Sequence, residues 1–119
     1  MSNPAEHHRI SYIEFITNDM ARTRKFYSTV FGWTFKDWGP EYIGFEGAGI
    51  SGGFGKGEAA SEKTASTPLV VIYSADLKAT EAAIVAAGGQ IVVHTFEFPG
   101  GRRFHFSDGA GNVLGVWSE

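Results

Sequence analysis

The sequence predicts an α+β fold of two tandem βαβββ modules, whose curved mixed sheets surround a cleft and carry their helices on the outside. The first observation is an internal repeat, because Tyr12–Trp33 matches Leu69–Gln90 at an offset of 57 residues and Asp19 falls on Asp76. The second is that each copy reads as an apolar strand, an Asp able to cap a helix, an amphipathic segment and a Gly able to end it. The third is that three short β-prone runs follow each copy.

The first copy begins with an apolar strand over Tyr12–Ile16, and Asp19 then starts a helix that Gly32 ends. One face of this helix carries an apolar stripe of Phe26, Tyr27, Val30 and Phe31, as expected of a half-buried helix. Turn-forming residues separate the strands that follow. These strands are predicted over Trp33–Phe35, Tyr42–Glu46 and Ile50–Phe54.

The second copy repeats this order, with a strand over Leu69–Tyr73, a helix capped by Asp76 and a stop at Gly89. The helix stripe consists of Leu77, Thr80, Ile84 and Ala87. The three strands after it are predicted over Gln90–Phe96, Arg103–Ser107 and Asn112–Trp117.

Residues 55–67 are small, polar and without periodicity, which is typical of a linker. We therefore expect module one over about 9–55, a linker over about 56–67 and module two over about 68–118. A four-stranded sheet with one helix leaves its other face bare, so the modules should share one concavity and form a single domain over 1–119.

Composition excludes several classes of function. The chain has no Cys, so thiol catalysis, iron–sulfur clusters and Cys-type zinc sites are ruled out. A net charge of −3, spread evenly, argues against nucleic acid as a partner. No apolar run reaches the ~18 residues of a membrane span, and residues 1–6 lack the basic start and apolar region typical of a signal peptide. We expect a cytoplasmic protein with no membrane partner.

The alternation of apolar and polar side chains along the strands predicts where a functional site lies. Ile13 and Phe15 are apolar neighbours of Tyr12 and Glu14, and in the last two strands apolar residues alternate with polar or aromatic ones in the same way. The face away from the helices should therefore carry Tyr12, Glu14, Arg103, His105 and Trp117. A solvated outer face gives the same alternation. Bare aromatic rings and three ionisable groups favour a ligand cleft.

Glu14 and His105 are the candidate catalytic residues, because imidazole beside a carboxylate suits proton transfer near neutral pH. The alternatives are a His105 that only completes a hydrogen bond and a Glu14 buried in a pair with Arg103. Tyr12 and Trp117 are candidate ligand-stacking residues, with a purely structural role as the alternative. Arg103 is a candidate ligand-binding residue for an anionic group.

Residues 47–52 match G-x-G-x-x-G, but no helix follows them, so the phosphate-binding mechanism of that motif does not apply. These glycines should instead permit a bulged strand or leave space for a ligand beside the backbone.

Two segments resemble the vicinal oxygen chelate superfamily, which includes glyoxalase I, extradiol dioxygenases and bleomycin or fosfomycin resistance proteins. Residues 19–33 resemble its D-x-x-x-x-x-x-FY…FGW signature. Residues 98–112 resemble its F-x-D-P-x-GN ending, with Gly109 where Pro is usual. The likeness covers nearly the whole chain and is best to the short glyoxalase-like subgroup. It implies paired modules curling around one site, commonly completed by a second chain, hence a homodimer.

The resemblance also locates the metal ligands of metal-using members, at four positions. Here they match Tyr12, Gly52 or Gly53, Leu69 or Val70, and Gly115. None is a normal ligand of a divalent cation. We therefore expect no metal cofactor, and a glyoxalase-like protein that binds a small organic molecule, with any chemistry limited to proton transfer. The alternatives are a metal-dependent lyase or isomerase of lactoylglutathione lyase type, with a metal on a rearranged set such as His105 and Glu14, and a drug-sequestering resistance protein.

Overall fold

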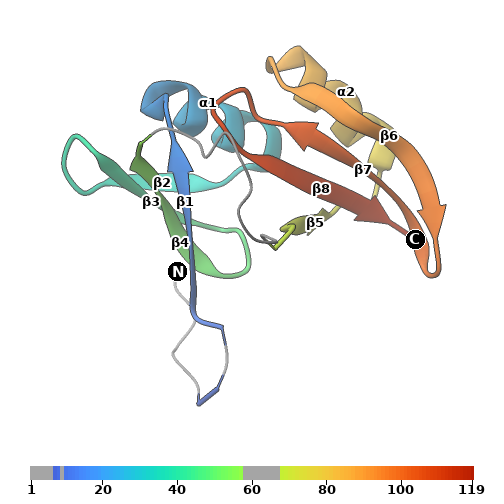
Figure 1. Cartoon of the computed structure of the whole chain (residues 1–119), viewed down its shortest axis with the longest axis horizontal. Helices are drawn as coiled ribbons and strands as arrows, with labels where there is room; N and C mark the ends of the chain where they lie inside the picture. Colours follow the sequence, from blue (N-terminus) through green and yellow to red (C-terminus); the bar gives the residue numbers. More distant parts are fainter. Residues whose placement is uncertain (1–6, 9, 58–67) are drawn as a thin grey trace. The chain divides into compact units, whose positions relative to one another are not determined.

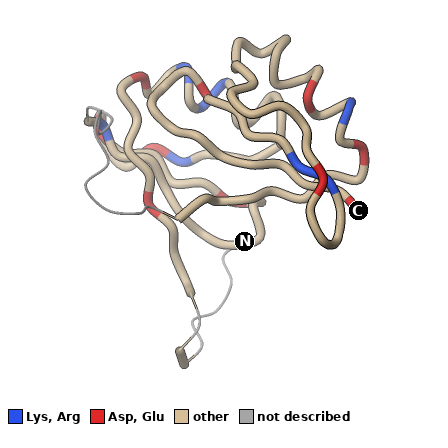
Figure 2. The backbone as a smooth tube through the Cα atoms, turned by 45° about the vertical axis from the view of Figure 1, so that its right-hand side comes forward, with Lys and Arg blue, Asp and Glu red and all other residues tan. Residues whose placement is uncertain are grey.

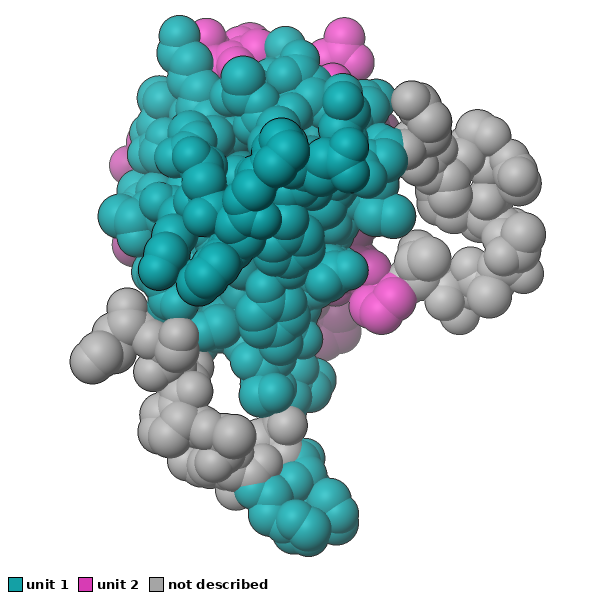
Figure 3. Space-filling view, turned by 90° about the vertical axis from the view of Figure 1, so that its left-hand side faces the viewer, with its two compact units in different colours: residues 1–59 teal, residues 60–119 magenta. Residues whose placement is uncertain are grey.

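The computed structural model of the chain describes residues 7, 8, 10–57 and 68–119. The chain divides into two compact units, residues 1–59 and residues 60–119, which are coloured separately in Figure 3. Each unit contains one α-helix and one four-stranded mixed sheet (Figure 1). The predicted α+β class and the two βαβββ modules are thus confirmed.

In the first unit, the sheet has the strand order β1-β4-β3-β2. Strand β1 runs parallel to β4, and the other neighbours are antiparallel. The elements are β1 (Tyr12–Thr17), α1 (Met20–Phe31), β2 (Thr34–Asp37), β3 (Tyr42–Glu46) and β4 (Ser51–Lys56).

The second unit repeats this topology, with the strand order β5-β8-β7-β6 and β5 parallel to β8. Its elements are β5 (Val71–Tyr73), α2 (Leu77–Ala86), β6 (Gln90–Phe98), β7 (Gly101–Ser107) and β8 (Val113–Ser118). Every strand and helix expected from the sequence is present, and each strand end lies within two residues of its predicted place.

A side-chain network repeats at the start of both helices. In the first unit, the Asp19 carboxylate accepts a hydrogen bond from the Arg22 N–H at 3.0 Å. The Thr17 hydroxyl accepts from the Asp19 N–H at 3.0 Å and lies 2.7 Å from the Thr23 hydroxyl. The second unit has the same contacts 57 residues later, at 3.1 Å for Asp76–Ala79, 3.0 Å for Ser74–Asp76 and 2.7 Å for Ser74–Thr80. The internal repeat therefore extends to individual hydrogen bonds.

The two helix ends differ. Gly32 ends α1 in the left-handed conformation at φ 75°, as predicted. The predicted stop at Gly89 is wrong by one residue, because the left-handed residue after α2 is Gly88, at φ 97°. The N–H groups of Gly88 and Gly89 bond to the carbonyls of Val85 and Ile84 at 3.1 and 2.9 Å, the pattern of a Schellman motif. The two helix ends do not match because, at the repeat offset of 57 residues, α2 would end at position 88 if it were as long as α1. It ends two residues earlier, at Ala86.

The core of the first unit is aromatic. The Tyr27 ring on α1 lies 4.9 Å from that of Trp33 and 5.1 Å from that of Phe54, and Phe45 lies 4.7 Å from Trp33. In the second unit, seven apolar side chains are at most 5% exposed, namely Leu77, Ile84, Phe104, Phe106, Ala110, Leu114 and Val116. Phe26 and Tyr27 of the predicted α1 stripe are buried, whereas Val30 and Phe31 are partly exposed.

Strand β4 ends at Lys56, so Gly55 and Lys56 are part of the sheet and not of the linker to which their composition assigned them. Residues 58–67, the rest of the predicted linker, lie outside the described residues. Lys and Arg are interspersed with Asp and Glu along both units (Figure 2). In the described part of the chain, no helix has the length and apolar character needed to cross a membrane.

Candidate functional site

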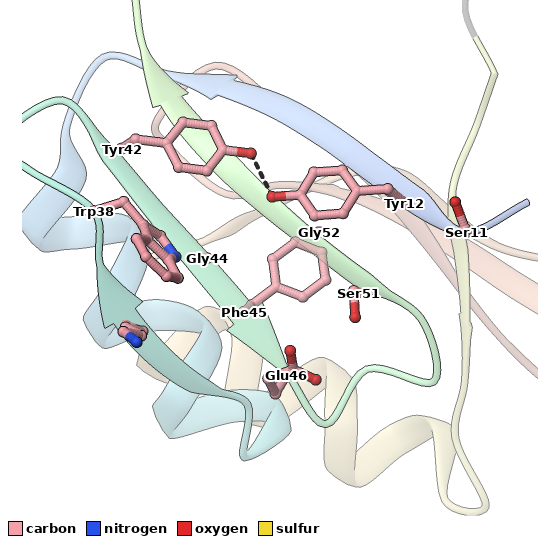
Figure 4. A pocket seen from close by; sticks show the side chains of 10 residues that line it. Ser11, Tyr12, Trp38, Tyr42, Gly44, Phe45, Glu46, Ser51 and Gly52 are labelled. Carbon is pink, nitrogen blue, oxygen red and sulfur yellow. Dashed lines mark hydrogen bonds between the residues drawn. The ribbon is translucent and has the colours of Figure 1, made fainter. Parts of the chain in front are cut away.

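Each sheet has a face turned away from its buried residues, here called the open face. On β3, Ile43 and Phe45 are 2% exposed, so Tyr42, Gly44 and Glu46 point to the open face. That face carries a pocket of about 590 Å³ (Figure 4), a size typical of small-molecule sites. The aromatic side chains of Tyr12, Trp38 and Tyr42 line it, together with the polar groups of Lys36, Glu46 and Ser51.

Glycines form the floor under these aromatic rings. A Cβ at Gly53 would lie 2.4 Å from the Tyr42 Oη, and one at Gly44 would lie 3.0 Å from the Trp38 Nε1. The rings therefore lie directly against the backbone, where only glycine leaves room for them.

The glycine-rich strand itself is regular. Strand β4 keeps an unbroken register with both β1 and β3, so the predicted bulge is wrong. The bulges of the described sheets lie in β6, between Ile91 and Phe96. Glycine is used in β4 for close approach of aromatic side chains, and Tyr42 fills the space beside Gly53 that the sequence suggested for a ligand.

Tyr42 links two residues that the sequence singled out. Its hydroxyl donates to the Glu14 Oε1 at 3.1 Å. It also lies 2.6 Å from the Tyr12 hydroxyl (Figure 4). A phenol has one proton and a carboxylate only accepts, so Tyr12 donates to Tyr42 and Tyr42 to Glu14. Burial, and then the hydrogen bonds with Tyr12 and Glu14, raise the pKa of the Tyr42 phenol. Tyr42 thus stays protonated and acts as a hydrogen-bond donor.

In the second unit, the predicted alternation is also found. Phe104 and Phe106 are fully buried, and Arg103 and His105, which alternate with them along β7, point to the open face. Trp117 on β8 lies directly opposite Arg103 in the sheet register. The structure therefore brings together Arg103, His105 and Trp117 in this unit, as it brings together Tyr12 and Glu14 in the first.

Aromatic rings hold the Arg103 guanidinium. Its Cζ lies 5.2 Å from the centre of the Phe96 ring and 5.4 Å from that of Phe98. Trp117 continues this wall, with its ring 6.3 Å from Phe98 and 5.1 Å from Tyr73. Trp117 therefore packs against two aromatic neighbours, and its partly exposed side chain still reaches the open face. Its role in stacking on a ligand stays a prediction.

His105 lies beside this cluster, with its ring 5.8 Å from that of Phe96. The His105 Nε2 and the Arg103 Nε are both buried, and neither has a hydrogen-bond partner among the described residues. Burial, and then the positive charge of Arg103, lower the pKa of the His105 imidazole. A pairing of Glu14 with His105 or Arg103 joins residues of the two units and stays a prediction.

The four positions at which metal-using relatives carry ligands do not fit a divalent cation. A side chain at Gly52 would begin 2.2 Å from the Ile13 carbonyl oxygen, and one at Gly53 would collide with Tyr42. A Cβ at Gly115 would lie 3.3 Å from the His105 Cδ2, so the imidazole borders that position. Within residues 10–57 and 68–119, no three His, Asp or Glu side chains gather closely enough to hold a metal.

Sequence reasoning missed Tyr42, Trp38 and Lys36 as site residues. Tyr42 lies on the same face of β3 as Gly44 and Glu46, and the alternation of side chains along this strand could have identified it. Trp38 lies in a turn and is 61% exposed, so no periodicity marks it. Its place over Gly44 follows from the Trp38 N–H bonding to the Tyr42 carbonyl at 2.9 Å.

Two βαβββ units, each with titratable and aromatic groups on its open face, define a paired-module protein with a ligand-sized pocket. The profile of the Glyoxalase/Bleomycin resistance protein/Dioxygenase superfamily matches residues 9–116. The chain belongs to this superfamily, which confirms the resemblance found in its sequence.

Solved structures of the superfamily have the same fold. The fosfomycin resistance protein FosX from Listeria monocytogenes is similar with a TM-score of 0.78 and 21% identity, over 96% of this chain and 93% of that one. A family enzyme from Burkholderia phytofirmans PsJN gives 0.74 and 20%, over 91% and 96%. A glyoxalase-related enzyme from Fulvimarina pelagi gives 0.75 and 21%, over 94% and 88%. No curated protein matches the chain.

Proposed function

We propose that the pocket of the first unit binds a small organic molecule and that it does so without a divalent cation. The observation that carries this proposal is a cavity of about 590 Å³ lined by three aromatic side chains, those of Tyr12, Trp38 and Tyr42. Membership of the superfamily supports it, because small-molecule binding is common to its members. The donor-poor residues at the four metal positions favour binding by the protein alone.

The ligand needs an apolar, flat part and at least one polar group. Trp38 and Tyr42 present ring surfaces, which favour stacked or edge-on contact with another ring. The Ser51 hydroxyl lines the pocket and is buried without a hydrogen-bond partner among the described residues. A polar ligand group beside it would offset the free-energy cost of that unpaired hydroxyl.

Any chemistry at this site is proton transfer. Glu14 is exposed and accepts the Tyr42 proton in a hydrogen bond, so a ligand that displaces that bond meets a carboxylate able to act as a base. Tyr42 remains a donor to ligand oxygen. His105, on the open face of the second unit, is neutral near pH 7 because its pKa is lowered, and it is the candidate base of that unit.

We infer further that the protein is a homodimer in the cytoplasm, as the family resemblance and the composition suggest. Sedimentation velocity on untagged protein tests the first point. A single species with the mass of one chain, over a hundredfold range of concentration, would contradict it.

A thermal-shift screen of aromatic and aliphatic fragments, followed by calorimetry of the hits, tests ligand binding. Trp38→Ala should weaken a hit by roughly tenfold, because an aromatic contact contributes about 1.4 kcal/mol. Tyr42→Phe should weaken it whenever the ligand uses the hydroxyl. Tyr73→Phe is the matched control, since Tyr73 also donates to a carboxylate, that of Glu119 at 2.6 Å, and does not line the pocket.

Two results would overturn the proposal, namely no saturable hit or hits that bind Trp38→Ala and Tyr42→Phe as tightly as the unchanged protein. The fate of a bound hit separates the remaining functions. A ligand recovered unchanged after long incubation supports the alternative of a drug-sequestering resistance protein. An isomerised or cleaved ligand supports a lyase or isomerase.

A further inference from the structure

The second unit contains two nitrogen atoms whose hydrogen-bonding capacity is unused. The Arg103 Nε and the His105 Nε2 are buried and lack a hydrogen-bond partner among the described residues. An unpaired buried polar group costs about 1 to 3 kcal/mol, and a charged one costs more. Two such groups on adjacent open-face positions of β7 are therefore expected to have an external partner.

The two side chains point the same way and come from one strand. Residues 103 and 105 are two apart on β7, so they share the open face and are separated by about 7 Å along the strand. Phe96, on β6, contacts both, since it lies opposite Arg103 and its ring is also beside the His105 ring. Phe96 therefore packs beside both donor side chains.

Three carboxylates among the described residues of the second unit, those of Glu97, Asp108 and Glu119, are engaged elsewhere or face away. Glu97 neighbours Phe96 on β6 but lies opposite Arg102, whose side chain alternates to the other face. The Glu119 carboxylate accepts from the Tyr73 hydroxyl. The Asp108 carboxylate accepts from the N–H groups of Ala110 and Asn112. No ion pair of Arg103 with an acidic side chain is found among residues 68–119.

We propose that Arg103 and His105 form an oxyanion site that takes a carboxylate or a phosphate group. A guanidinium presents a planar fork of donors that matches such groups, and a neutral imidazole adds one N–H donor. Phe96 and Phe98 flank the guanidinium, and their low polarity strengthens its interaction with a bound anion. The site consists of residues of the second unit alone and does not require the first unit's pocket to bind a ligand.

Protonation of His105 reports on the site in the unchanged protein. The residues that face His105 from the neighbouring strands are Val93 on β6 and Gly115 on β8, with Phe96 beside the ring, and none of them titrates. Arg103 is the charged group that acts on the imidazole. A bound oxyanion counters that charge and favours the imidazolium.

Calorimetry with benzoate, phenyl phosphate and inorganic phosphate tests the proposal, with benzamide as the uncharged control. We expect saturable binding of at least one anion and none of benzamide at equal concentration. Saturation by benzoate only assigns a carboxylate ligand, and saturation by the phosphates only assigns a phosphate ligand. Arg103→Gln should weaken binding at least tenfold. Arg102→Gln, on the opposite face of the same strand, removes the same charge and should change affinity by less than about twofold.

The His105 imidazole, followed by NMR in the unchanged protein, gives a readout that needs no variant. Its pKa should rise when the binding anion is added, and benzamide should leave it as it is. The proposal is wrong if no anion saturates below 10 mM, if the two arginine variants weaken binding equally, or if a bound anion leaves the His105 titration unmoved. Arg103→Lys keeps the charge without the fork and replaces Arg103→Gln if that variant does not fold.

Discussion

At the scale of single residues, Tyr42 determines how the polar groups of the first unit act together. Tyr12 and Glu14 lie on the same face of β1, and the Tyr42 hydroxyl from β3 connects them at 2.6 and 3.1 Å. Glu14 therefore acts as an accepting carboxylate next to aromatic rings. A pair of Glu14 with Arg103 would join the two units and stays a prediction.

The acidity of His105 leads to a prediction about a single residue. Because its pKa is lowered in the folded chain, the unfolded chain, with a pKa near 6.5, binds more protons between the two values. The contribution of His105 to the free energy of unfolding should thus be complete above about pH 6.5, and it should be lost as the pH is lowered from there. Urea unfolding at pH 7.5 and pH 5.0 measures this loss.

His105→Gln should remove that part of the acid loss. His94→Gln, which deletes an exposed imidazole on β6, is the matched control and should keep it. If His105→Gln loses as much stability on acidification as the unchanged protein, burial of His105 does not set its acidity.

At the scale of elements, β4 depends on glycine at particular positions. Gly52→Ala would place a methyl carbon 2.2 Å from the Ile13 carbonyl oxygen and 2.3 Å from the Phe45 ring, neither of which has room to move. We expect a loss of at least about 2 kcal/mol in the free energy of unfolding. Gly55→Ala, whose added carbon meets the Tyr42 ring at 3.4 Å, should cost less than about 1 kcal/mol. Equal costs in urea unfolding would refute the close packing of β1, β3 and β4.

The helix caps make a second prediction at this scale. Asp19→Ala and Asp76→Ala each remove a side-chain acceptor from the first turn of a helix, so each should lower the free energy of unfolding by about 1 kcal/mol. The matched controls, Asp19→Asn and Asp76→Asn, keep an oxygen acceptor and should lose a few tenths at most. Chemical denaturation measures all four, and Asn variants as unstable as the Ala variants would argue against capping.

At the scale of the whole molecule, both units are built on one plan. Each has a parallel pair at one edge of its sheet, an antiparallel remainder and a helix capped by an Asp-centred network. Each open face carries the residues expected to bind or react. The repeat thus distributes the predicted site residues over two units, with two in the first and three in the second.

The donor-poor metal positions lead to a prediction for the whole protein. Dialysis of untagged protein against EDTA should leave the melting temperature within about 1 °C, and added zinc, nickel or manganese should not raise it, because a bound ligand stabilises only the state that binds it. Differential scanning calorimetry with elemental analysis measures both effects. A stoichiometric metal that is lost together with several degrees of melting temperature would show a rearranged metal site.

The sequence by itself determined the fold class, the order of the elements and the faces of the strands. Period-two alternation separated Phe104 from His105, and Asp19 and Asp76 marked both helix starts. These features follow from contacts between residues close in the chain, which local patterns encode.

Only the tertiary structure decided which groups meet. Tyr42 reaches Glu14 because β4 lies between β1 and β3 and its Gly53 leaves room for a ring. The same register makes β4 regular where a bulge was expected, and it places Trp38 against Gly44. Strand order and register arise from pairing between distant segments, and the period of a single strand is the same whatever its neighbour is. The pocket of the first unit and the Phe-flanked Arg103 of the second therefore became visible only in the folded chain.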